Sequence, residues 1–136
     1  MEISQSGIFA ITLICSDLKA SKAFYEQVFE KALVHEDAVS ALYSFDTVYV
    51  NLLQESEAAG LFAPMEPGET NQRPRALLTV QVGSVDAEIK RLAKLTEATG
   101  LEIQMVGGPI NRPWGIRTQN IADPDGNIWE LSEQLT

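Results

Sequence analysis

The stretch PWGIRTQNIADPDGNIWEL (residues 113–131) concentrates side chains that could do chemistry. Its acidic tight turn, DPDG, lies between two short runs typical of β-strands, and Glu130 lies near the end of the second run. A carboxylate in a partly apolar hollow could accept hydrogen bonds from a ligand, attract a cationic group, or serve as a general acid or base. A structural pairing of Glu130 with Arg117 or with the amide of Asn120 is the alternative.

Metal-ligating and nucleophilic side chains are scarce in this sequence. The only histidine, His35, is followed by two acidic residues where a turn is expected, so we expect it on the surface. The only cysteine, Cys15, lies in an apolar run and is expected to be a small core residue rather than a nucleophile. A transition-metal site needs imidazoles, thiolates or several converging carboxylates. We therefore expect no metal and no other cofactor, although Glu130 with Asn51 could bind Mg or Ca weakly.

The elements that would position these residues follow the same order twice. The first half predicts a strand, a helix that Ser16 and Asp17 can cap, and three strands: residues 8–15, 18–33, 33–36, 40–45 and 48–54. The second half predicts a strand, a helix between Ser84 and Gly100, and three strands: residues 76–82, 85–98, 101–106, 115–122 and 127–132. The fold class is therefore α+β, with an internal repeat of about 65 residues.

Residues 55–75 separate the two halves. This segment holds three of the six prolines and shows no sustained period, so it is predicted to be a linker or a lid. Its apolar members, Phe62 and Met65, could pin the segment to the body of the protein or cover a pocket.

Strand residues alternate between two faces, which sorts the candidate site residues. If Asp123 and Asn127 face each other across the DPDG turn, Asn120 lies opposite Glu130, on the face away from the helices. The polar and aromatic residues of such faces are predicted to bind a ligand: Tyr49, Asn51, Thr79, Gln81, Trp114, Thr118, Asn120 and Glu130. Because Trp and Tyr are costly to leave in open water, this set favours a cavity over a solvent-facing sheet surface.

Charge and length limit the partners. The 136 residues suit one domain, and the net charge of −9 argues against nucleic acid, whose phosphates require clustered Lys and Arg. The acidity would suit a cationic ligand, although solvated surface acid is the simpler interpretation. The first residues, MEISQSG, lack the features of a secretory signal, and no run is apolar for long enough to span a membrane. We therefore expect a soluble, cytoplasmic protein without membrane contacts.

Three segments resemble the vicinal oxygen chelate superfamily, which includes glyoxalases, extradiol dioxygenases, and fosfomycin and bleomycin resistance proteins. They are ITLICSDLKASKAFYEQVF (residues 11–29), VQVGSVDAEIKRL (80–92) and the stretch at 113–131. The resemblance implies one domain over residues 1–136, built from two tandem βαβββ modules near 7–54 and 76–134 with the linker at 55–75. In that superfamily the curved mixed sheet encloses a cavity, usually in a homodimer.

The resemblance also bears on metal binding. Metalloenzymes of the superfamily hold a divalent ion with four inward side chains, and the resemblance places those positions on Ala10, Asn51, Leu77 and Glu130. Only Glu130 matches the ligand type expected at its position. A member without a metal is therefore implied.

Three functional hypotheses remain open. The PWG-x-R spacing before DP-x-GN is similar to bleomycin resistance proteins, which implies a metal-free protein that sequesters an antibiotic or a cationic or planar metabolite. In that case Trp114 would stack on the ligand, and Asn51, Asn120 and Glu130 would hydrogen bond to it. The alternative is a lyase, isomerase or dioxygenase of the same superfamily that uses Glu130 as a base or metal ligand. The third hypothesis is a protein-binding domain whose hollow is filled by side chains.

Overall fold

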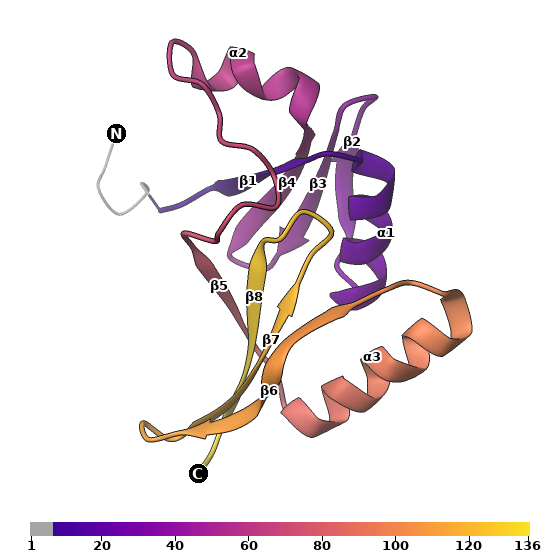
Figure 1. Ribbon diagram of the computed structural model, residues 1–136, viewed down its shortest axis with the longest axis vertical. Coiled ribbons are helices and arrows are strands. Elements are labelled where there is room, and N and C mark those ends of the chain that lie inside the picture. The colour runs from indigo at the N-terminus through magenta and orange to yellow at the C-terminus, as the bar shows by residue number, and fades with distance from the viewer. Residues whose placement is uncertain (1–6) are drawn as a thin grey trace. The chain divides into compact units, whose positions relative to one another are not determined.

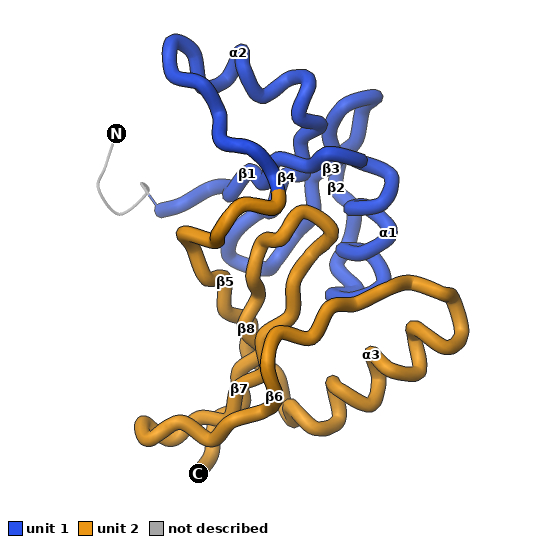
Figure 2. The backbone as a smooth tube through the Cα atoms, in the orientation of Figure 1, with its two compact units in different colours: residues 1–70 blue, residues 71–136 orange. Residues whose placement is uncertain are grey.

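The computed structural model describes residues 7–136, and the chain forms two compact units, residues 1–70 and 71–136 (Figure 2). The boundary between the units lies inside the predicted linker. Each unit contains one four-stranded mixed sheet with one long helix (Figure 1). The fold is therefore α+β with two βαβββ modules, as the sequence predicted.

The first unit follows the predicted order of elements. The strands and the helix are β1 (Ala10–Cys15), α1 (Leu18–Val28), β2 (Leu33–Glu36), β3 (Ser40–Phe45) and β4 (Val48–Gln54). The sheet order is β1-β4-β3-β2, in which β1 runs parallel to β4 and the other pairs are antiparallel. Helix α1 packs on β3 and β4. Cys15 is buried, as predicted, and His35 is exposed on β2.

The ends of α1 have local causes. Asp17 caps the helix, because its Oδ1 accepts hydrogen bonds from the backbone N–H groups of Lys19 (3.1 Å) and Ala20 (3.4 Å). The apolar pattern predicted a helix to residue 33, but α1 ends at Val28. Glu30 adopts a positive φ of 54°, a backbone conformation that cannot continue a right-handed helix. The apolar residues therefore keep a helical spacing up to Leu33, although the helix ends at Val28.

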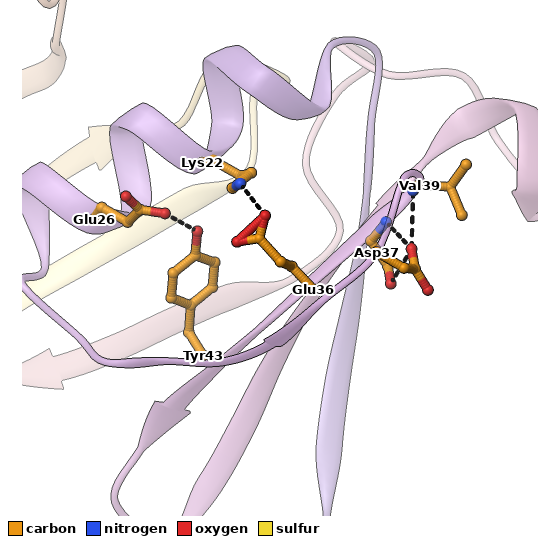
Figure 3. A network of polar contacts seen from close by, with 7 residues as sticks. Lys22, Glu26, Glu36, Asp37, Val39 and Tyr43 are labelled. Atoms are coloured by element: carbon orange, nitrogen blue, oxygen red, sulfur yellow. Dashed lines mark hydrogen bonds and ion pairs between the residues drawn. The ribbon is translucent and has the colours of Figure 1, made fainter.

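A polar network lies beside the core of the first unit (Figure 3). The hydroxyl of buried Tyr43 donates a hydrogen bond of 2.6 Å to Glu26 on α1. Burial, together with this bond, raises the pKa of the Tyr43 phenol above its ordinary value. Lys22 lies 2.9 Å from Glu36, and that hydrogen bond raises the pKa of Lys22. These contacts join α1 to strands β2 and β3.

The segment after β4 contains structure that the sequence did not predict. A 3-10 turn (Glu55–Glu57) leads into the short helix α2 (Ala58–Phe62). Phe62 and Met65 are both exposed. Neither side chain lines a described pocket, so the suggestion that they cover one gains no support.

The second unit repeats the first. Its elements are β5 (Leu77–Gln81), α3 (Val85–Thr99), β6 (Gln104–Arg112), β7 (Ile116–Ala122) and β8 (Ile128–Gln134), in the sheet order β5-β8-β7-β6. Ser84 caps α3 by accepting from the N–H of Ala87 at 3.1 Å, and Gly100 ends it with a φ of 76°. Helix α3 packs on β7 and β8, where Trp129 and Leu131 are each 3% exposed. Both caps and the inward side of β8 match the prediction.

Strand β6 differs from the prediction of a strand at residues 101–106. It begins later, at Gln104, and extends to Arg112, with a register shift against β7 between Val106 and Ile110. The shift contains Gly107, whose φ is 71°. Gly107, Gly108 and Pro109 interrupt the alternation of apolar and polar residues along β6. The full length of the strand could therefore not be predicted from that alternation.

Within residues 7–136, no helix is long and apolar enough to cross a membrane.

Candidate functional site

Three predicted site residues meet on one face of the second sheet. Thr79 on β5 pairs with Glu130 on β8, and Glu130 pairs with Asn120 on β7. This register requires the DPDG turn to close between Asp123 and Asn127, and the N–H of Asp123 donates to the carbonyl of Asn127 at 2.9 Å. Residues directly opposite each other in a sheet share a face. The predicted opposition of Asn120 and Glu130 is therefore confirmed.

The hydrogen-bond partner of Glu130 is neither of the two predicted from the sequence. The hydroxyl of Thr79 donates a hydrogen bond of 3.0 Å to Oε1 of Glu130. Arg117, one of the two partners considered, instead forms an ion pair of 3.0 Å with Asp86. The Glu130 carboxylate is thus held by a neutral donor from the neighbouring parallel strand. Its second oxygen, Oε2, takes no part in that bond.

Asn120 carries an unsatisfied polar atom. Its side-chain oxygen, Oδ1, is buried and has no hydrogen-bond partner among the described residues. Leaving a buried acceptor unpaired costs about 1–3 kcal/mol, so such atoms are rare in folded proteins and mark places where a ligand or water completes the structure. Asn120 also lines the larger of two described pockets.

That pocket belongs entirely to the second unit and has a volume of about 730 Å³. Small-molecule sites typically measure roughly 300–1,000 Å³, so a drug-sized ligand would fit. The pocket is lined by the starts of β5, β6 and β8, the end of β7, the DPDG turn and the segment that precedes β5. Its lining residues are Asn71, Gln72, Pro74, Arg75, Ala76, Leu77, Gln104, Val106, Asn120, Ala122, Gly126 and Ile128.

The DPDG turn fixes one wall of this pocket. The Asp123 carboxylate accepts hydrogen bonds of 2.9 Å from the backbone N–H groups of Asp125 and Asn127, which shape the turn. The carbonyl of Asp125 then accepts from the N–H of Asn71 at 2.8 Å. Gly126 has a φ of 85°, and a Cβ there would lie 3.3 Å from Cα of Asn71. Only glycine allows this approach without strain, so the turn clamps the start of the segment 71–76 to the sheet.

Asn120 is the one predicted binding residue that lines this pocket, and Thr79 and Glu130 share its sheet face but lie outside the lining. Thr118 and Gln81 flank Ser132 on the same face as Glu130. Thr118 is 2% exposed, and its hydroxyl accepts a hydrogen bond of 3.2 Å from Nε of Arg112. Trp114 lies in the turn between β6 and β7 and is 69% exposed. None of these residues lines the pocket.

Tyr49 and Asn51 belong to the first unit, on β4. The ring of Tyr49 lies 5.0 Å from that of Phe9, measured between centroids. The Asn51 amide donates a long hydrogen bond of 3.5 Å to Thr12 on β1. Their predicted role in ligand binding remains a prediction.

The pocket residues that precede β5 were not predicted from the sequence. Asn71, Gln72 and Arg75 fall in a segment without periodicity, which gives no indication of the side on which a residue lies. The one available signal was Asn71 itself, since asparagine is among the few residues that tolerate a positive φ, here 61°.

A smaller pocket of about 390 Å³ lies in the first unit. Its lining residues are Ile14, Glu55, Ala58, Pro67, Gly68, Glu69 and Thr70. The charged residues of the two pockets therefore differ in sign, with two glutamates here and Arg75 in the second unit.

The donor set does not fit a transition metal. Of the four positions to which the resemblance assigns metal ligands, Ala10 and Leu77 are aliphatic, Asn51 offers an amide, and Glu130 alone is a carboxylate. Across the described part of the chain, no three His, Cys, Asp or Glu side chains gather as a metal site would require.

Comparison with known proteins places the chain in a family. The family model for the glyoxalase-like domain matches residues 8–136. The chain therefore belongs to this family, within the vicinal oxygen chelate superfamily of glyoxalases, bleomycin resistance proteins and dioxygenases. No curated protein matches the chain closely enough to count as a relative.

Several solved structures are similar. A glyoxalase-related enzyme from Fulvimarina pelagi aligns with a TM-score of 0.78 and 22% identity, covering 95% of this chain and 88% of that one. A glyoxalase/bleomycin resistance protein/dioxygenase from Nocardioides gives 0.75 and 22%, covering 98% and 87%. A lactoylglutathione lyase from Agrobacterium tumefaciens gives 0.67 and 26%, covering 94% and 93%. The first two establish a shared fold, and the names of all three cover more than one kind of function.

Proposed function

We propose that this protein binds a small molecule in the pocket of its second unit and acts by sequestering that molecule without a metal ion. The observation that carries the proposal is Asn120, which lines a pocket of about 730 Å³ and has a buried Oδ1 without a partner among the described residues. A few polar groups among mainly apolar walls are the usual arrangement of a ligand site. The open pocket also supports ligand binding over a hollow filled by side chains.

We also propose the kind of ligand, a role for Trp114 and a homodimer, all of which were expected from the sequence. An antibiotic or a planar metabolite is the proposed kind of ligand, since the pocket volume suits molecules of that size. Trp114 is proposed to contact the ligand only if its exposed turn moves toward the pocket. A homodimer is proposed on the family resemblance alone, and analytical ultracentrifugation tests it.

Sequestration is favoured over metal-assisted turnover because of the residue types present. Lewis-acid chemistry requires an ion held by several protein ligands, and a single carboxylate beside Thr79 and Asn120 would hold a divalent ion weakly. A binding protein needs shape, apolar walls and a few placed polar groups. The pocket of the second unit supplies all three.

An enzyme is the second candidate, and Glu130 is the observation that favours it. Its carboxylate is half-buried on the same sheet face as Asn120, where it could remove a proton from a bound carbonyl compound. The similarity to a lyase at 26% identity is consistent with that role. A Glu130→Gln variant that retains ligand affinity but loses turnover would favour the enzyme.

A ligand screen combined with elemental analysis tests the proposal. A panel of planar and charged aromatic compounds should include members that raise the melting temperature of the wild type, because a ligand of the folded state stabilises it. Asn120→Leu should reduce that shift, and Arg73→Gln, outside the pocket lining, should not. Absence of any shift across the panel, or a stoichiometric divalent ion that survives dialysis, would contradict the proposal.

A further inference from the structure

We propose that the pocket of the second unit selects ligands that carry both an anionic group and a hydrogen-bond donor on an apolar body. This inference rests on the proposed function and names the chemistry of its ligand. Three features of the pocket lining carry it: the charge, the unpartnered acceptor and the apolar walls.

The charge of the lining is positive. Arg75 is the single charged side chain among the residues that line the pocket, and no carboxylate lines it. Arg75 is exposed, and within residues 7–136 no ion pair or hydrogen bond engages its guanidinium. An arginine at the rim of an apolar hollow favours carboxylate or phosphate groups, because its planar guanidinium donates paired hydrogen bonds to them.

The net charge of the chain does not describe this pocket. Residues 1–70 contain 11 acidic and 3 basic residues, whereas residues 71–136 contain 8 and 7. The excess acid therefore belongs to the first unit, where it includes the two glutamates of the smaller pocket. The expectation of a cationic ligand came from the whole-chain charge, and the lining of the larger pocket points to the opposite sign.

The donor requirement follows from Asn120. Asn120 lines the pocket and its Oδ1 has no partner among the described residues, so a ligand N–H or O–H that reaches this oxygen would gain a hydrogen bond and satisfy it. A ligand that presents only acceptors would leave this oxygen unpaired. An apolar body of the ligand would contact the rest of the lining, which is largely aliphatic: Pro74, Ala76, Leu77, Val106, Ala122 and Ile128.

Four indoles of similar size separate these requirements. Indole-3-acetate has an anion and an N–H donor, 1-methylindole-3-acetate has the anion alone, 3-methylindole has the donor alone, and tryptamine has the donor with a cation. Isothermal titration calorimetry of the full chain should rank indole-3-acetate first. Methylation of the nitrogen should weaken binding about three- to tenfold, as expected for one hydrogen bond. Loss or reversal of the charge should weaken binding about fivefold or more, near the upper limit for a partly exposed ion pair.

Matched variants assign these effects to residues. Arg75→Gln should weaken binding of indole-3-acetate about fivefold and leave 3-methylindole unchanged. Arg73→Gln, which removes the same charge two residues away and outside the lining, should leave both unchanged. Asn120→Leu should abolish the difference between indole-3-acetate and its 1-methyl derivative while the melting temperature shows that the variant is folded.

The outcomes separate this inference from the proposed function. Tryptamine or 3-methylindole could bind as tightly as indole-3-acetate, with that binding weakened by Asn120→Leu. In that case the pocket binds ligands but the anion requirement is wrong. If Arg75→Gln and Arg73→Gln weaken indole-3-acetate equally, the attraction is a general effect of net charge, and the assignment to Arg75 is overturned. If none of the four indoles binds, the inference fails. If the wider panel also gives no thermal shift, the proposed function fails with it.

Discussion

The hydroxyl of Thr79 donates a hydrogen bond of 3.0 Å to the carboxylate of Glu130, across the parallel strands β5 and β8. The first unit contains the corresponding contact, in which the Asn51 amide donates to Thr12 at 3.5 Å between β1 and β4. The internal repeat therefore extends from the order of elements to one pair of side chains. In the second unit the carboxylate takes the place of the amide, and a shorter, charge-assisted bond results.

Thr79→Val tests the strength of that contact. The substitution keeps the shape of the side chain and leaves the Glu130 carboxylate without the hydroxyl donor. We expect the free energy of unfolding to fall by about 1 kcal/mol, because the bond is charge-assisted but exposed to water. Thr12→Val is the matched control and should cost less. Urea denaturation measures both, and equal losses would show that the Glu130 bond has no special strength.

Asn120→Leu should stabilise the unliganded protein. The unpaired Oδ1 costs free energy in the folded state, so replacing it with an apolar group of similar size should raise the free energy of unfolding by about 1 kcal/mol. The same variant should bind ligand more weakly. Asn51→Leu on β4 of the first unit, where the amide is hydrogen-bonded to Thr12, is the control and should give no such gain. A loss of stability in Asn120→Leu would mean that the oxygen is satisfied in solution.

Gly126→Ala should loosen the clamp between the DPDG turn and Asn71. Alanine is strained at a φ of 85°, and its Cβ would lie 3.3 Å from Cα of Asn71. We expect a loss of about 1–2 kcal/mol in thermal or urea unfolding and weaker ligand binding. Gly83→Ala, with nothing within 4 Å of its Cβ, is the control and should be nearly neutral. Undiminished ligand affinity in Gly126→Ala would show that the clamp does not shape the pocket.

Alkaline pH should destabilise the first unit through Tyr43. Burial and the bond to Glu26 raise the pKa of its phenol, so the neutral form is favoured in the folded state. The resulting stability is fully present below the ordinary phenol value of about 10 and is lost as the pH rises above it. Lys22, whose pKa is also raised, contributes with the same sign. Unfolding measured between pH 8 and 11 should show the loss, and Tyr43→Phe should reduce its slope.

The sequence predicted those features that depend on neighbouring residues. Asp17 and Ser84 mark the starts of helices because their side chains accept hydrogen bonds from nearby backbone N–H groups. Gly100 marks the end of a helix because it adopts a left-handed backbone conformation. The opposition of Asn120 and Glu130 followed from the closure of one short turn. Such features need no knowledge of the rest of the fold.

Features that depend on distant segments could not be predicted in this way. Arg75 and Asn71 line the pocket because the DPDG turn, more than forty residues later, holds the segment that carries them. Strand β6 continues past the register shift at Gly107, where the alternation of apolar and polar residues is broken. The sequence therefore predicted that Asn120 lies opposite Glu130 on one sheet face, but it did not predict the pocket residues that precede β5.

The central claim is that ligand binds in the pocket of the second unit beside Asn120. Titration of ¹⁵N-labelled protein with indole-3-acetate, followed by ¹H–¹⁵N correlation spectra, tests it most directly. The account predicts that shift changes concentrate at residues 71–77, 104–106 and 120–128 and include the side-chain amide of Asn120. Changes confined to the first unit, around Glu55 and Glu69, or changes spread evenly over the chain, would contradict it.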